Sequence, residues 1–406
     1  MTPKEQSYVG IDVGSTKINV VVGIIEEPGK PSVIGVGSYP TSGLRKGVVI
    51  DVEETVSSIS GAVELAERSA GVHISNATIN IDGSHVASLN SRGVIAVGRA
   101  DSEITFEDTI RATEAAQAIS LPSNKEIIHV IPREYTVDGQ IGIKDPIGMS
   151  GVRLEVETHI ITGSQPAIRN LYKCFTQAGL NIDDRIATPL AAAKAVLTKR
   201  QRELGCVLID IGGGTTSIAV FDEGNELYTC ILPIGSGHVT NDIAIGLRSS
   251  IDIAEKVKLK YGYASPIEIP EKEKIDLAEF GGEGTTFKRQ VAKIVEARLK
   301  ELFDLVRDEL RRVGKDAMLP GGAVISGGGA NMPGIVGLAK SILKLPCEIS
   351  SPKGLQGLVE KVSAPEYATA LGLMLYSMDK QRTLGGNEKL AKAFERIKKL
   401  VRIFLP

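Results

Sequence analysis

The sequence predicts an α/β protein made of two similarly built lobes, and two observations carry this prediction. First, a strand–tight turn–strand pattern occurs at residues 8–23 and again at residues 206–221. Each copy has a short apolar run, then Asp-x-Gly with small neighbours, then a run rich in Val and Ile. Second, strand-like and helical patterns alternate through the rest of the chain, which is typical of α/β proteins. Two distant copies of one pattern therefore predict two lobes of the same design.

Composition narrows the class of protein. The chain has 406 residues, a formal net charge of −2, 4% aromatic residues and no Trp. This length allows two to three domains. The charge and the few aromatic residues argue against nucleic acid as a partner. The sequence contains no run of 18 apolar residues, so we predict no membrane-spanning helix. The four cysteines lack CxxC spacing, so we expect reduced thiols in a cytoplasmic protein rather than a zinc site or disulfides.

Local patterns place the main elements. A helix is predicted over residues 52–70, and the glycine that follows is expected to end it. A second helix is predicted over residues 104–119, which begin with a capping-box pattern. Strands are predicted over residues 126–137 and 152–162. A long helix is predicted from about residue 287 to 313. Its single apolar stripe is expected to pack against a sheet.

The two Asp-x-Gly turns have the chemistry of a polyphosphate site. Backbone N–H groups of a tight turn form a concave anion nest, and glycine lets a phosphate approach closely. A carboxylate just before each turn, Asp12 and Asp210, is suited to holding Mg²⁺ through water. Two such hairpins facing each other would hold a polyphosphate from two sides. The predicted phosphate-binding residues are Gly14, Ser15, Thr16 and Lys17 in the first copy and Gly212, Gly213, Gly214, Thr215 and Thr216 in the second.

A third glycine-rich motif follows a strand-like run at residues 323–326. It spans residues 326–334, and its glycines would allow a flat ligand such as a purine to approach. Its proposed binding residues are Gly327, Gly328, Gly329 and Asn331. In this order, the three motifs resemble the phosphate-one, phosphate-two and adenosine motifs of the actin, DnaK-type chaperone and sugar kinase superfamily. This resemblance implies an actin-like two-lobed ATPase fold that binds ATP, with Asp12 and Asp210 near Mg²⁺.

Other segments resemble further parts of that superfamily. Residues 184–193 and 363–372 resemble the two connecting helices that join the lobes. Glu255 and Lys258 resemble the pair that relatives place on the ribose and adenine. Thr188 stands where relatives have a Glu or Gln that positions the attacking water. Because a hydroxyl is a poor general base, we expect at most weak ATPase activity and predict no catalytic residue.

The chain as a whole resembles the FtsA family of bacterial cell-division proteins. The segments that carry this resemblance are residues 10–17, 43–49, 188–193 and 326–334, together with a basic amphipathic tail. The resemblance implies an inserted small domain and four named domains. They are lobe 1A at residues 1–82, 160–200 and 373–378, domain 1C at 83–159, lobe 2A at 201–242 and 313–372, and domain 2B at 243–312.

The C-terminal tail is predicted to be a membrane-targeting amphipathic helix. A flexible linker is expected at residues 379–388, because two adjacent glycines occur there, and the helix at 389–406. Residues 388–406 carry six basic and two acidic residues, a net charge of +4, so the rest of the chain carries −6. Such a helix lies in the interface of an anionic membrane. The predicted membrane residues are Leu390, Phe394, Ile397, Leu400, Val401 and Phe404 on the apolar face, with Lys398, Lys399 and Arg402 beside them.

The resemblance also implies a function. FtsA-family proteins polymerise at the inner face of the cytoplasmic membrane at the division site. They bind the C-terminal tail of the tubulin-like FtsZ through 2B and later division proteins through 1C. Two alternatives stay open: an FtsA-like protein of type IV pilus assembly, and a small-molecule kinase of the same superfamily. A kinase needs an Asp at the substrate hydroxyl. Asp242 is the nearby candidate, although a helix cap is the role expected for it.

Overall fold

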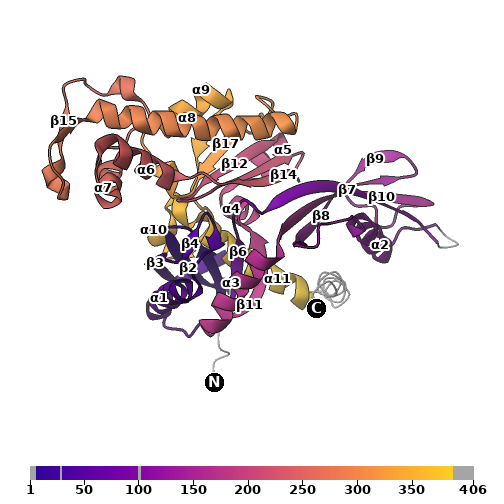
Figure 1. Cartoon of the computed structure of the whole chain (residues 1–406). Helices are drawn as coiled ribbons and strands as arrows, with labels where there is room; N and C mark the ends of the chain where they lie inside the picture. The colour runs from indigo at the N-terminus through magenta and orange to yellow at the C-terminus, as the bar shows by residue number, and fades with distance from the viewer. Residues whose placement is uncertain (1–5, 28–29, 99–101, 387–406) are drawn as a thin grey trace.

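The computed structural model describes residues 6–27, 30–98 and 102–386. Figure 1 shows two lobes stacked one above the other, with a third part projecting to one side. The first lobe holds the N-terminal strands, and the second holds the long helix α8 (Lys288–Arg312) on its outer face.

The first lobe contains a six-stranded sheet. The first three strands along the chain, β1 (Tyr8–Val13), β2 (Lys17–Glu27) and β3 (Lys30–Pro40), form an antiparallel meander. On the other side of β1, strand β6 (Asn76–Ile81) lies parallel to β1, and β11 (Asn181–Ala187) lies parallel to β6. The strands in spatial order are β11 (Asn181–Ala187), β6 (Asn76–Ile81), β1 (Tyr8–Val13), β2 (Lys17–Glu27), β3 (Lys30–Pro40) and β19 (Gln356–Gly357). Helices α1 (Val52–Ala70) and α3 (Gln165–Gln177) pack on it, as Ile59 and Phe175 share one core with its strands. Helix α1 ends at Gly71, as predicted.

The second lobe repeats this design. Its strands in spatial order are β18 (Cys347–Ile349), β17 (Ala323–Ser326), β12 (Cys206–Ile211), β13 (Thr216–Asp222) and β14 (Asn225–Leu232). Here too the Asp-x-Gly hairpin begins an antiparallel meander, formed by β12, β13 and β14. On the other side of β12, strands β17 and β18 continue the sheet in parallel. The registers also correspond, because Asp12 is opposite Asn19 and Asp210 is opposite Ser217. The prediction of two similarly built lobes is therefore confirmed.

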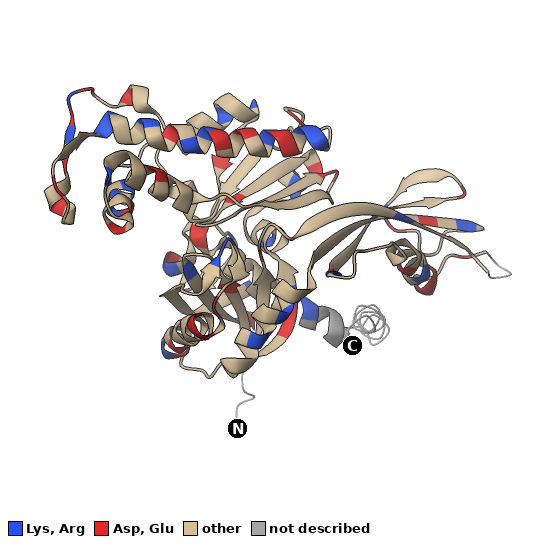
Figure 2. Cartoon of the chain, in the orientation of Figure 1, with Lys and Arg blue, Asp and Glu red and all other residues tan. Residues whose placement is uncertain are grey.

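Helices cover the second lobe on its outer side. They are α6 (Ser236–Leu247), α7 (Ile251–Tyr261), α8 and α9 (Ile335–Leu343). The predicted long helix is confirmed as α8, and its apolar stripe is buried with strand residues such as Ile209. Figure 2 shows acidic and basic residues interspersed along the whole length of α8. Short elements complete the chain: β4 (Leu44–Arg45), β5 (Val48–Val49), α5 (Lys199–Leu204), β15 (Lys274–Asp276), β16 (Thr285–Phe287) and α10 (Val359–Val362), with 3-10 turns at Pro266–Glu268, Leu277–Phe280, Gly328–Asn331 and Pro365–Tyr367.

The projecting part consists of β7 (Ala87–Ala96), α2 (Phe106–Gln117), β8 (Lys125–Val137), β9 (Gln140–Ile143) and β10 (Arg153–Ser164). These elements confirm the predicted helix and strands of this region, including the capping box at Thr105. Strand β7 also pairs with β14 of the second lobe at Ala87 and Cys230. The sheet of the second lobe thus continues into the projecting part and becomes nine-stranded.

Two helices lie between the lobes. The first predicted connecting segment is the end of β11 followed by α4 (Thr188–Val196), and the second includes the start of α11 (Ala368–Gly386). Both contribute to a core that contains strand residues of both lobes, including Val21 and Leu208. A side chain at Gly372 would overlap the carbonyl group of Ala191, so glycine permits this close helix crossing.

The prediction of a flexible linker at residues 379–388 is wrong over its described part, because α11 continues as a helix to Gly386. Residues 379–384 contain no glycine or proline, and adding a residue to an existing helix gains a hydrogen bond at low cost. Other predicted boundaries, at 159/160, 200/201, 242/243 and 372/373, fall inside β10, α5, α6 and α11. The predicted helix at 389–406, with all its membrane residues, lies outside the described residues. Among the described residues, no helix is both long and apolar enough to cross a membrane.

Candidate functional site

The two predicted phosphate-binding turns face each other across the lobes. In residues 14–17 the N–H of Gly14 donates to the carbonyl oxygen of Lys17 at 3.1 Å. In residues 212–215 the corresponding hydrogen bond is 2.9 Å long. We call these segments turn 1 and turn 2. A side chain at Gly213 would overlap the methyl group of Thr16, and a Cβ at Gly214 would lie 2.6 Å from Ser15 Oγ. The fold therefore brings the two turns together, as their sequences predicted.

Three aspartates lie beneath the turns: Asp82 and Asp210 are buried, and Asp12 is partly buried. Burial raises the pKa of Asp12 well above its usual range, and the negative charges of Asp210 and Asp82 raise it further. Burial, followed by repulsion from Asp82, raises the pKa of Asp210 to about 7. Burial also raises the pKa of Asp82. The raised pKa values mean that the charged form of each carboxylate is disfavoured, and a bound cation would offset this cost.

Asp82 was missed by the sequence analysis. A signal for it exists: it begins an Asp-Gly pair directly after β6, and β6 is the parallel neighbour of β1. Parallel strands end at the same edge of a sheet, so Asp82 and Asp12 come together. Thr215 of turn 2 donates a 2.8 Å hydrogen bond to Asp82 Oδ2, which links the lobes. Asp82 Oδ1 is buried without a hydrogen-bond partner.

These carboxylates fit a magnesium ion held through water. Among the described residues, no group of three or more His, Cys, Asp or Glu side chains is arranged to ligate a metal directly. Mg²⁺ usually keeps several waters and binds through one or two carboxylates together with phosphate oxygens. The unpartnered oxygen of Asp82 is an acceptor that such a water would satisfy.

Thr188 and Asn80 complete the site on the first lobe. The amide of Asn80 donates to Asp12 Oδ1 at 2.9 Å and to Thr188 Oγ1 at 3.2 Å. Thr188 in turn donates to the carbonyl oxygen of Ile81 at 3.1 Å, and it is only 5% exposed. The hydroxyl of Thr188 is therefore occupied by structural hydrogen bonds.

The third motif lies against the second hairpin. Gly327 has φ +80°, and a Cβ there would lie 2.8 Å from Asp210 Oδ1. A Cβ at Gly329 would overlap the side chain of Ile211, whereas Gly328 is exposed and a Cβ there would lie 3.9 Å from the Cβ of Glu366. Two of the three glycines are thus required by packing, and Gly328 is the one whose backbone faces outward.

Glu366 joins the third motif to turn 1, and the sequence analysis missed it as well. Its carboxylate pairs with Lys17 Nζ at 3.2 Å and accepts from the Asn331 amide at 2.9 Å. Its carbonyl oxygen accepts from the Asn19 amide at 3.2 Å. Two predicted binding residues from distant parts of the chain, Lys17 and Asn331, therefore meet at one carboxylate.

Helix α6 connects the predicted Glu255 and Lys258 to turn 2. At its start, the N–H groups of Ser236 and Gly237 donate to the carbonyl oxygens of Gly212 and Gly213, each at 2.8 Å. Lys258 Nζ lies 2.7 Å from Glu255 Oε2. It also donates at 2.9 Å to Thr240 of α6. The pair is thus anchored to the helix that supports turn 2.

One predicted phosphate ligand points elsewhere. The hydroxyl of Thr216 is fully buried and donates to the carbonyl oxygen of Ile234 at 2.7 Å. Its side chain therefore serves the second lobe rather than the space between the turns.

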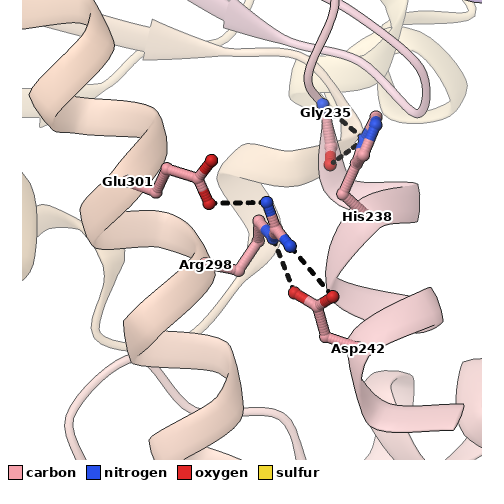
Figure 3. A network of polar contacts seen from close by, with 5 residues as sticks. All are labelled: Gly235, His238, Asp242, Arg298 and Glu301. Carbon is pink, nitrogen blue, oxygen red and sulfur yellow. Dashed lines mark hydrogen bonds and ion pairs between the residues drawn. The ribbon is translucent and has the colours of Figure 1, made fainter. Parts of the chain in front are cut away.

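Asp242 is not a helix cap, because it lies inside α6. Figure 3 shows it facing Arg298 of α8. Arg298 Nε lies 2.6 Å from Asp242 Oδ2, and Arg298 Nη2 lies 2.9 Å from Asp242 Oδ1, so the pair is bidentate. Glu301 holds the same guanidinium group from the next turn of α8. His238 contacts Gly235 at the start of α6, where the Gly235 N–H lies 3.1 Å from Nδ1.

Comparison with known proteins identifies the family. The chain is 38% identical over 418 residues to the cell division protein FtsA of Pseudomonas aeruginosa, and the match covers 97% of both chains. The chain belongs to the FtsA family of cell-division proteins. It is also 40% identical to FtsA of Bacillus subtilis, and this match covers 93% of this chain and 85% of that protein. It is 33% identical to FtsA of Escherichia coli, with 95% of this chain and 93% of that protein covered.

Family profiles agree with this assignment, and solved structures agree with the fold. The profile described as cell division protein FtsA matches residues 207–372, and that of the SHS2 domain inserted in FtsA matches residues 83–162. A PilM–PilN type IV pilus biogenesis complex has a TM-score of 0.65 at 19% identity, covering 91% of this chain and 98% of that chain. MreB5 of Spiroplasma citri bound to ADP has a TM-score of 0.57 at 14% identity, covering 95% and 100%. These neighbours confirm the actin-like fold of this FtsA-family chain.

Proposed function

We propose that this FtsA-family protein binds ATP with Mg²⁺ between its lobes. We further propose that it polymerises at the inner face of the cytoplasmic membrane, tethers the FtsZ ring there and recruits later division proteins. The observation that carries the proposal is the pairing of turns 1 and 2 above the carboxylates of Asp12, Asp82 and Asp210. Turn N–H groups suit phosphate oxygens, and the carboxylates suit a hydrated cation.

Further contacts support nucleotide binding. Actin-like neighbours of this fold include MreB5 of Spiroplasma citri bound to ADP and to AMPPNP. In this chain, Asn331 and the exposed Gly328 mark the adenosine side, while Glu255 and Lys258 lie beside the helix that supports turn 2. Turnover is expected to be slow, because the Thr188 hydroxyl is already hydrogen-bonded and is a poor base.

The partner assignments follow from membership in the family. Domain 1C, proposed at residues 83–159, takes later division proteins and contributes to filament contacts. Domain 2B, proposed at residues 243–312, takes the FtsZ C-terminal tail. The proposed membrane anchor is residues 389–406, whose basic and apolar residues suit an anionic lipid surface. A polymer that presents many such tails at once would bind far more tightly than one copy.

The alternative functions have less support. The carboxylate of Asp242 is held by Arg298, so it is not free to activate a substrate hydroxyl as a kinase requires. The likeness to the PilM–PilN complex is a likeness of fold at 19% identity, whereas the FtsA relatives reach 38–40%.

Lipid cosedimentation tests the membrane part of the proposal. Full-length protein with ATP is expected to pellet with vesicles containing anionic lipid and to carry FtsZ with it, and salt should weaken the binding. Deletion of residues 388–406, or Ile397→Glu together with Phe404→Glu, should abolish pelleting while ATP binding by calorimetry persists. Full recruitment of the deleted protein to protein-free vesicles would contradict the anchor assignment.

A further inference from the structure

A small hairpin beside the site has no role in the function described so far. Residues 44–49 fold as β4 and β5, joined by a turn at Lys46 and Gly47. Both turn residues have positive φ, +51° and +75°. Glycine adopts this conformation freely, but a lysine there is uncommon and is maintained only by its surroundings.

The tip of this hairpin contacts both phosphate turns. The N–H of Gly47 donates to Ser15 Oγ of turn 1 at 3.0 Å. A Cβ at Gly214 of turn 2 would lie 3.2 Å from the Cα of Lys46. A Cβ at Gly47 would lie 2.7 Å from Asp82 Oδ2. The backbone of Lys46 is therefore placed where the two turns and the buried Asp82 carboxylate meet.

The side chain of Lys46 extends from the hairpin tip beside the two turns. Its side chain is exposed, and no described residue forms an ion pair with it. Burial lowers the pKa of His238 at the start of α6, and the Lys46 cation lowers it further. The ammonium group is thus close enough to influence the helix that supports turn 2, yet it lacks an anionic partner.

The two flanks of turn 1 indicate which phosphate Lys46 would meet. On one flank, Lys17 is linked through Glu366 to Asn331 of the adenosine motif. On the other flank, Ser15 is linked to the tip that carries Lys46. A nucleotide lying along turn 1 with its base near Asn331 would place its last phosphate at the Lys46 end.

We infer that Lys46 binds the terminal phosphate of a nucleoside triphosphate and thereby distinguishes it from the diphosphate. This inference rests on the proposed nucleotide site between the turns. The terminal phosphate would bring further negative charge to a site that already contains Asp12, Asp82 and Asp210. A lysine provides a compensating point charge with three donors. Because the tip touches both lobes, the contact also favours the closed arrangement of the two turns.

Nucleotide affinity tests this inference without relying on turnover. Calorimetry would compare ATP, AMPPNP and ADP, each with Mg²⁺, on the full-length protein and on Lys46→Asn. Asn tolerates positive φ, so the charge is removed without straining the turn. Loss of one charge-assisted hydrogen bond should weaken ATP and AMPPNP binding about tenfold or more, with ADP affinity changed less than about twofold. Lys46→Arg should retain most of the preference.

The matched control is Arg45→Asn, which removes the neighbouring exposed cation on β4. It should leave the ratio of ATP to ADP affinity unchanged, and both variants should unfold at the wild-type temperature. Equal weakening of ATP and ADP by Lys46→Asn, or an unchanged ATP affinity, would overturn the inference while leaving the nucleotide site in place. Failure of the wild-type protein to bind any nucleotide would instead overturn the proposed function, and this inference with it.

Discussion

The two lobes have the same strand order and the same hairpin register, yet their turns differ in one respect. Turn 1 carries side chains at Ser15 and Thr16, whereas turn 2 has Gly213 and Gly214 at the facing positions. A side chain at either glycine would meet the side chain opposite. The comparison shows that the turns are complementary: one lobe supplies polar side chains, and the other supplies bare backbone and space.

The parallel strands beside the two hairpins differ in the same way. In the first lobe β6 is followed by Asp82, while in the second lobe β17 is followed by Gly327. Gly327 has a positive φ and lies against the carboxylate of Asp210, where any side chain would collide. One lobe therefore adds a charge, and the other leaves room for the charges already present.

The largest effect is expected from filling the space in turn 2. Gly213→Val would overlap Thr16 and should lower ATP affinity at least about 100-fold, while each lobe keeps its fold. Calorimetry measures the affinity, and thermal unfolding verifies the fold. Gly213→Ala with Thr16→Ala should bind better than Gly213→Ala alone, because the overlapping methyl group is removed. A double variant no better than the single one would refute the complementarity of the turns.

A pH-dependent effect is expected from Asp210. Its pKa rises from 3.8 to about 7 in the folded protein, so the native state binds a proton more tightly than the unfolded chain. The free energy of unfolding of the nucleotide-free protein should therefore fall as pH rises from about 4 to about 7, and flatten above that. Asp210→Asn should reduce this fall and weaken the Mg²⁺-dependent part of ATP affinity. Melts across pH 5–8 measure the first effect, and an unchanged slope in the variant would contradict it.

The smallest effect on ATP affinity is expected from breaking the ion pair that holds α6 behind turn 2. Turn 1 is supported by the tip of the β4–β5 hairpin, whereas turn 2 is supported by α6, which Asp242 joins to Arg298 of α8. The ion pair is partly exposed, with side chains 26% and 23% accessible. A double-mutant cycle with Asp242→Asn and Arg298→Gln should give a coupling energy of about 1 kcal/mol. ATP affinity should change less than about threefold. A loss as large as that of Gly213→Val would show that α6 itself positions the phosphates.

Much of the fold could be predicted because its signals are local. The strand–turn–strand pattern, the capping box at Thr105 and the apolar stripe of α8 each lie within one short segment. Local signals also misled in two places. Two adjacent glycines suggested a linker where α11 continues as a helix to Gly386. Asp242, expected as a cap, proved to be the partner of a residue 56 positions away.

The sequence by itself determined the two turns, their aspartates and the glycine motif, because backbone conformation and glycine spacing are properties of consecutive residues. Only the tertiary structure decided which residues surround them. Asp82 reaches the site because β6 pairs with β1, and Glu366 because α11 crosses between the lobes. Lys46 reaches it because a hairpin tip lies against Ser15 and Gly214. Such contacts join residues far apart in the chain, so no local periodicity records them; they exist only once the sheets and helices have packed.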